Sequence, residues 1–223
     1  MSSSLSLIQQ LAIYALPILL AITLHEVAHG WAARAFGDHT AANQGRLSLN
    51  PLKHVDPVGT LLMPAVTLLL GGMFFGWAKP VPVVESNLRN PRKHMAMVAA
   101  AGPMSNLAMA IAWGMILKIG LTLGRGDGLW MGLMYMANAG IMVNVIFMVL
   151  NLIPIPPLDG GRVLAGILPP QQAYKLSRVE PYGIAILFGL IILASMVPRF
   201  GALFWFPFGY MEMLVRSVLG LYR

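Results

Sequence analysis

The stretch LAIYALPILLAITLHEVAHGW, residues 11–31, joins a long apolar run to a cluster of ionisable side chains. None of the 24 residues before His25 is charged. A run of this length, at about 1.5 Å of helix rise per residue, is long enough to cross a bilayer core, which needs about 20 apolar residues. The stretch therefore predicts a membrane-spanning helix that carries His25, Glu26 and His29 near its inner end.

The composition of the whole chain agrees with a membrane location. Of its 223 residues, 57% are hydrophobic and only 10% are charged, whereas soluble domains carry roughly 25% charged residues. The net charge of +7 is explained by the enrichment of Lys and Arg in cytoplasmic loops, without a nucleic-acid partner. The absence of cysteine excludes disulfides and thiolate ligands, so any metal must be held by His, Asp or Glu.

Six apolar segments predict a single membrane-embedded domain over residues 1–223. They are 5–36, 58–78, 95–120, 129–153, 182–198 and 201–219. In lipid an open strand cannot satisfy its backbone, so we expect helices: an all-α integral membrane protein with a bundle of about five to six transmembrane helices and short extended segments near the active site. The core would span about 5–165, with accessory helices at about 182–220. The positive-inside rule, with the amino terminus outside, places Arg216 on the inner side.

The segment 58–78 is ambiguous between a full crossing and a re-entrant hairpin. Pro64 and the pair Gly71-Gly72 could bend it back on itself. A full crossing would also place the basic residues between Lys79 and Lys93 outside, against the positive-inside rule. We favour the re-entrant hairpin.

The sequence His25-Glu26-Val27-Ala28-His29 matches the pattern H-E-x-x-H. The i, i+4 spacing puts both imidazoles on one helix face, where they can share a tetrahedral zinc ion. Glu26, next to the first ligand, can take a proton from the attacking water and pass it to a leaving amine. A chance match, or two histidines hydrogen-bonded to neighbouring helices, is the alternative, but ionisable groups at membrane depth are usually functional.

A catalytic zinc ion usually has a third protein ligand, and Asp159 is the best candidate. It lies in NLIPIPPLDGGRVL, residues 151–164, directly after an apolar span that should return the chain to the side of His29. The prolines break the helix, and Gly160 and Gly161 allow close backbone approach. The alternative is an aspartate that caps the next short helix.

Together these motifs resemble the site-2 protease family of intramembrane zinc metalloproteases (peptidase family M50). HEVAH is followed by NLIPIPPLDG, in which the family's N-x-x-P-x-x-x-L-D-G motif is matched, and AAGPMSNLAMA at 99–109 is similar to its G-P-x-x-N helix. The resemblance is to the compact bacterial-type subgroup without PDZ or CBS domains. It implies one zinc ion bound by His25, His29 and Asp159, with Glu26 as the general base.

Three further residues are candidates for substrate or oxyanion contacts. Asn106 and Asn151 are neutral polar groups near membrane depth, which could hydrogen-bond an oxyanion or the substrate backbone, or could simply join helices. His54 could belong to the zinc site or to a surface loop, and the loop is favoured. The prolines of KPVPV, 79–83, suggest an extended edge that could pair with an unwound substrate.

The resulting hypothesis is an intramembrane zinc endopeptidase that acts in regulated intramembrane proteolysis. Its substrate would be a single-pass transmembrane protein whose helix can unwind, in the bilayer of the inner (plasma) membrane, with the active site near the cytoplasmic side. The alternatives are an H-E-x-x-H membrane protease of another family, which would use a glutamate as third ligand, and a non-catalytic zinc-binding scaffold. The sequence does not indicate an oligomeric state.

Overall fold

The fold was taken from a computed structural model that describes residues 6–62, 79–124 and 128–221. Within these ranges the chain is helical and contains no strand, so the predicted all-α class is confirmed. Four stretches are long and apolar enough to span a membrane: Ile8–Ala35, Pro91–Leu123, Gly128–Asn151 and Pro170–Met196. This is fewer than the five to six predicted, because most of segment 58–78 lies outside the described residues and the last segment is not such a span.

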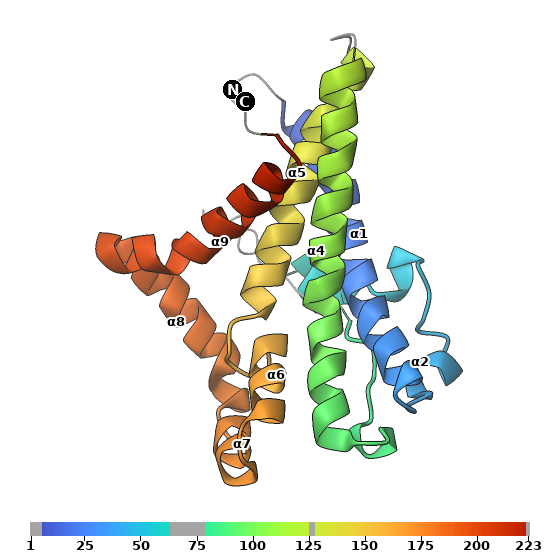
Figure 1. Ribbon diagram of the computed structural model, residues 1–223, viewed down its shortest axis with the longest axis vertical. Helices are drawn as coiled ribbons and strands as arrows, with labels where there is room; N and C mark the ends of the chain where they lie inside the picture. Colours follow the sequence, from blue (N-terminus) through green and yellow to red (C-terminus); the bar gives the residue numbers. More distant parts are fainter. Residues whose placement is uncertain (1–5, 63–78, 125–127, 222–223) are drawn as a thin grey trace.

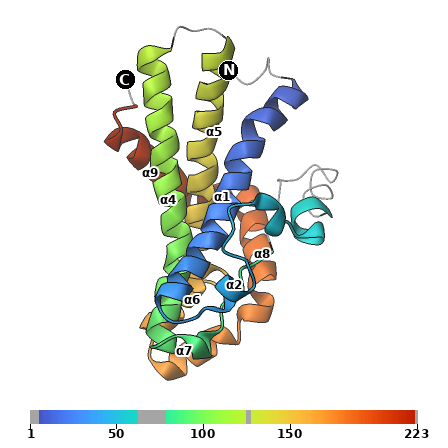
Figure 2. The same cartoon turned by 90° about the vertical axis from the view of Figure 1, so that its right-hand side faces the viewer.

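Three long helices form the centre of the bundle: α1 (Leu7–Ala35), α4 (Pro91–Leu123) and α5 (Gly128–Asn151). They run side by side, with α4 antiparallel to the other two (Figures 1 and 2). We call the end of the bundle at which α1 ends and α4 begins the basal end, and the opposite end the distal end. Small residues allow close packing: a side chain at Gly140 would lie 2.3 Å from the Trp113 ring.

The basal end is closed by the short helices α6 (Asp159–Ile167) and α7 (Pro170–Ser177). The prolines after Asn151 stop α5, because proline lacks the N–H that a helix needs. The chain then turns α6 back against the start of α4, where the Arg92 Nε donates to the Ala165 carbonyl. This turn places the first residue of α6, Asp159, beside α1.

The chain returns toward the distal end through α8 (Gly183–Met196) and α9 (Pro198–Val218). In Figure 1, α9 packs against α5, and its last turn points toward the end of the bundle at which α1 begins. Phe208 and Val215 of α9 join the main hydrophobic core of α4 and α5.

This path corrects the predicted position of Arg216, which does not lie at the basal end. Its guanidinium donates to Asn138 Oδ1 of α5 at 2.7 Å and forms an ion pair with Glu212. The residue that follows α9 by two positions, Gly220, lies near Lys118 in the distal part of α4. The positive-inside rule was misleading here because Arg216 has its own partners within the bundle.

The predicted hairpin falls largely on residues 63–78, which lie outside the described residues. Its two flanks are described, and they meet: the Lys79 N–H donates to the His54 carbonyl at 2.9 Å.

Candidate metal centre and active site

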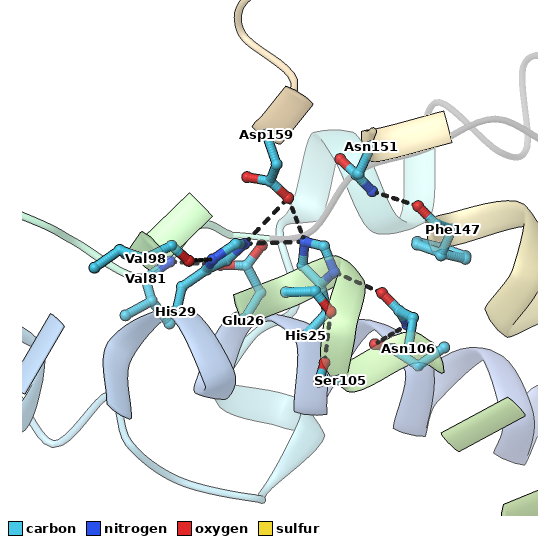
Figure 3. Close-up of polar contacts among 12 residues, drawn as sticks. His25, Glu26, His29, Val81, Val98, Ser105, Asn106, Phe147, Asn151 and Asp159 are labelled. Carbon is cyan, nitrogen blue, oxygen red and sulfur yellow. Dashed lines mark hydrogen bonds and ion pairs between the residues drawn. The ribbon is translucent and has the colours of Figure 1, made fainter. Parts of the chain in front are cut away.

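Three potential metal ligands converge where α1 passes α6 (Figure 3). His25 and His29 lie one turn apart on α1, and their Nε2 atoms are 3.0 Å apart. The Asp159 Oδ2 lies 3.1 Å from the His25 Nε2 and 3.3 Å from the His29 Nε2. The structure therefore brings together the three residues that the motifs selected, although Asp159 follows His25 by 134 residues and His29 by 130 residues along the chain.

The hydrogen bonds behind the two imidazoles fit three acceptor atoms arranged to hold a cation between them. The His29 Nδ1 faces the Val98 carbonyl at 2.8 Å, and a carbonyl can only accept, so this Nδ1 carries the proton. The His25 Nδ1 faces the Asn106 Oδ1 at 2.6 Å, which is also an acceptor. Both Nε2 atoms then offer bare lone pairs toward the buried Asp159 Oδ2, which has no hydrogen-bond partner of its own.

The spacing of the three atoms fits zinc. Ligands at about 2.0–2.1 Å from a tetrahedral zinc ion lie roughly 3.3–3.4 Å from one another. The separations of 3.0, 3.1 and 3.3 Å are close to this value. Two neutral imidazoles and one carboxylate are also a typical catalytic zinc set, which leaves a fourth position for water.

Asp159 does not act as the helix cap that was its alternative interpretation. The residue at the N-cap of α6 is Leu158, and no side chain caps this helix. Asp159 is instead the first helical residue, 9% exposed, and its carboxylate points toward the two histidines (Figure 3).

Glu26 lies beside the three ligands and is held by the extended segment 79–84. The Val81 N–H donates to the Glu26 Oε2 at 2.7 Å, and Val84 has extended backbone angles. A charge-assisted bond of this kind fixes the orientation of the carboxylate. Glu26, Val81 and Asn151 line a cavity of about 160 Å³ with the three ligands, so this carboxylate is available to a reacting group there.

The segment 79–84 is anchored at both ends. At its start, the Arg46 Nη2 donates to the carbonyls of Lys79 and Pro80 at 2.9 and 3.2 Å. At its end, the Val84 N–H donates to the fully buried Asp38 at 2.7 Å. Burial raises the pKa of the Asp38 carboxyl, but hydrogen bonds from Thr40, Val84 and Asn87 outweigh it and lower the pKa to about 2. Asp38 is therefore an ionised anchor at neutral pH.

The three additional candidates lie in different places. Asn151 lines the cavity, and its Nδ2 donates to the Phe147 carbonyl. Asn106 is fully buried behind His25 and is not among the residues that line the cavity. Its side chain contacts the candidate zinc ligand His25, whereas a substrate contact had been expected. His54 is not part of the cluster: it lines a separate small pocket with Leu19 and Thr23 of α1, and its Nε2 faces the Ser48 carbonyl.

Gly102 is a site residue that the sequence reasoning missed. A side-chain carbon built at this position would lie 2.5 Å from the His29 ring and 2.6 Å from the His25 ring. Only glycine lets α4 approach the two ligands so closely. The position is visible in the sequence as part of the G-P-x-x-N element, but nothing in the sequence shows which residues face it.

We expect Gly102→Ala to lower zinc affinity and peptide cleavage by roughly 10- to 100-fold, the range found when the support of metal ligands is disturbed. The added methyl group must push at least one imidazole away. Zinc content after dialysis and cleavage of a model substrate would measure both effects. Gly132→Ala is the matched control, because its added carbon meets no described atom within 4 Å apart from its chain neighbours and the backbone of its own helix. Normal zinc binding in Gly102→Ala would show that the imidazoles can shift without loss.

Comparison with known proteins identifies the family. The profile of Peptidase family M50 matches residues 119–195. A curated relative from Bacillus subtilis, named "Putative zinc metalloprotease YwhC", is 39% identical over 177 residues, which cover 78% of each chain. The chain belongs to Peptidase family M50. Proteins named "Putative zinc metalloprotease Rip2" from Mycolicibacterium smegmatis and Mycobacterium tuberculosis are 32% and 31% identical, over 84% of this chain and 70% of theirs. No solved structure matches this chain significantly.

Membership of this family makes the protein an intramembrane zinc metalloprotease, and its predicted enzyme class and cofactor are confirmed. The four apolar stretches found in the described part of the chain agree with a membrane protein. Neither a protease of another H-E-x-x-H family nor a non-catalytic scaffold is favoured by these relatives.

Proposed function

We propose that this protease hydrolyses peptide bonds within transmembrane segments of single-pass membrane proteins, with His25, His29 and Asp159 as the zinc ligands and Glu26 as the general base. The observation that carries this proposal is the convergence of three lone-pair atoms beside the Glu26 carboxylate, two of them on α1, a helix long enough to span the membrane.

The depth of the site supports cleavage inside the bilayer. His25 follows the start of α1 at Leu7 by roughly 27 Å of helix at 1.5 Å per residue. The hydrocarbon core is about 30 Å thick, so a helix that enters it near Leu7 carries His25 inside the core, close to its basal face. Arg34, Arg89 and Arg92 lie at this end. By the positive-inside rule we assign the basal end to the cytoplasmic side of the plasma membrane.

Each residue of the site has a separate task in this mechanism. Glu26 takes a proton from the attacking water and delivers it to the leaving amine. Zinc, when bound, supplies a Lewis acid for the carbonyl and lowers the pKa of water to about 7. Asn151, on the cavity wall, is placed to hydrogen-bond the peptide oxygen or the substrate backbone.

The segment 79–84 is the proposed guide for an unwound substrate. Pro80, Val81 and Val83 line the cavity, and Arg46, Glu26 and Asp38 hold the segment in place. An extended peptide could therefore add along this edge, with main-chain hydrogen bonds giving affinity. Substrate helices rich in Gly, Pro or Asn would unwind most readily onto it.

Removal of zinc tests the proposed function directly. In liposomes containing a single-pass substrate, we expect chelation to lower cleavage by at least about 100-fold, because the metal supplies several kcal/mol of barrier lowering, and added Zn²⁺ to restore it. Mass spectrometry of the fragments should place the cut inside the transmembrane segment. A matched substrate whose Gly, Pro and Asn residues are replaced by Leu should be cut more slowly. Cleavage that survives chelation, or cuts confined to soluble loops, would contradict the proposal.

A further inference from the structure

Asn144 is a completely buried amide in the middle of the apolar helix α5. A polar group at this depth is costly unless it is hydrogen-bonded. Its Nδ2 donates to the Gly140 carbonyl at 2.9 Å, and its Oδ1 accepts from the Asn106 Nδ2 at 3.0 Å. Asn144 does not line the cavity, so it has no direct contact with a reacting group.

Asn144 belongs to a chain of hydrogen bonds that runs from the Gly140 carbonyl to His25. The Gly140 carbonyl determines which atom donates and which accepts at each step. The Gly140 carbonyl can only accept, so the Asn144 Nδ2 must face it and the Asn144 Oδ1 must face Asn106. Asn106 must then donate through its Nδ2, which leaves its Oδ1 for His25. The His25 Nδ1 consequently carries the proton, and the His25 Nε2 offers its lone pair toward His29 and Asp159.

We propose that Asn144 is a positioning residue for the zinc ligand His25, acting through Asn106. This proposal rests on the proposed zinc site and extends it to a residue on a third helix. The chain Gly140–Asn144–Asn106–His25 runs from α5 through α4 to α1, so all three central helices fix the tautomer and ring orientation of one ligand. Partners behind a metal-binding histidine commonly control both properties.

The Ala21 carbonyl is the other acceptor for the Asn106 amide, at 3.3 Å. The bond to Asn144 is shorter, at 3.0 Å, and an amide nitrogen has two protons to place. Without Asn144, one buried proton of Asn106 would lose its partner, and Asn106 could shift away from His25. If Asn144 served only to join α4 and α5 by a hydrogen bond, its loss would lower the stability of the fold without changing zinc binding through Asn106.

A double-mutant cycle on zinc binding separates these two roles. We expect Asn106→Leu to weaken zinc binding by about 10- to 100-fold, as for direct outer partners of a ligand. Asn144→Leu, one step further away, should weaken it by about 3- to 10-fold. The double variant should lie within about twofold of Asn106→Leu alone, because the effect of Asn144 passes through Asn106. Zinc affinity would be measured by chelator competition on the purified full-length protein in detergent.

Co²⁺ substitution provides a readout that does not depend on cleavage. The visible d–d absorption of bound Co²⁺ reports the geometry of its ligands, and we expect it to change in Asn144→Leu and in Asn106→Leu. Asn138→Leu is the matched control, since it removes from the same helix an amide that accepts a hydrogen bond from Arg216. It should leave zinc affinity within about twofold and the Co²⁺ spectrum unchanged. Asn144→Ala repeats the cycle without added volume, in case the Leu variant does not fold.

The outcomes distinguish this proposal from the function on which it rests. Asn144→Leu could weaken zinc binding by the same factor in the unaltered protein and in the Asn106→Leu variant, or could leave it unchanged. Either result would overturn the positioning role while leaving the zinc site intact. Failure of the unaltered protein to bind Zn²⁺ or Co²⁺ would instead refute the proposed metal site itself.

Discussion

Glu26→Gln is expected to lower the rate of peptide cleavage by about 10²- to 10⁴-fold, the usual contribution of a general base, while zinc remains bound. Glutamine has the shape of glutamate but cannot take up the proton of the attacking water. Its Oε1 can still accept from the Val81 N–H, which holds Glu26 at 2.7 Å, so the segment 79–84 should keep its position. Cleavage of a single-pass substrate in liposomes and zinc content per protein would be measured together.

Glu85→Gln is the matched control for this substitution. Glu85 is exposed and lies just after the same segment, so the same chemical change there should leave cleavage and zinc content unaltered. Full activity in Glu26→Gln would remove Glu26 from the mechanism. Loss of zinc in that variant would show that the carboxylate supports the metal.

The proposed ligand set could be predicted because its main part is local. Two histidines at i and i+4 face the same way on any helix, so His25 and His29 required no knowledge of the fold. Asp159 required more, since its place beside them depends on the proline break after α5 and the turn into α6. Here the pattern N-x-x-P-x-x-x-L-D-G supplied what helix periodicity could not. The structure then brought the three residues together.

The positions behind the ligands could not be predicted, because they depend on how each helix is rotated about its axis. A soluble helix reveals its inner face by an apolar stripe, but α4 and α5 are apolar nearly all round. The sequence therefore did not show that Gly102 faces both imidazoles or that Asn106 lies behind His25. The partner of Asn106 on α5, Asn144, was invisible for the same reason.

Arg216 shows the limit of a rule based on charge alone. The positive-inside rule describes loops near the ends of spans, whereas Arg216 lies within α9 and is held by Glu212 and Asn138. An arginine with such partners can be placed away from the basic face. Only the three-dimensional contacts of α9 with α5 could have shown this.

Asp159→Ala is expected to have the largest effect on the metal. It removes one of three proposed ligands, so zinc affinity should fall by more than about 100-fold. Even the mutation of a residue that only supports a ligand commonly lowers metal affinity by about 10- to 100-fold. The two Nε2 atoms, 3.0 Å apart, would then face each other without the carboxylate that balances the cation. Cleavage should be lost at ordinary zinc concentrations and return in part at high Zn²⁺. Chelator competition and a zinc titration of activity would measure both effects.

Asp159→Asn decides whether the carboxylate acts as a ligand or only supports the start of α6. Asparagine is as good a helix cap as aspartate, but its neutral amide is a poor zinc ligand. If Asp159 mattered only for the helix, Asn would preserve zinc binding and cleavage. Because Leu158 occupies the N-cap and Asp159 Oδ2 lies 3.1 and 3.3 Å from the two imidazoles, we expect Asn to weaken zinc binding nearly as much as Ala, with helical content unchanged by circular dichroism. Retention of zinc in Asp159→Asn would therefore require another third ligand.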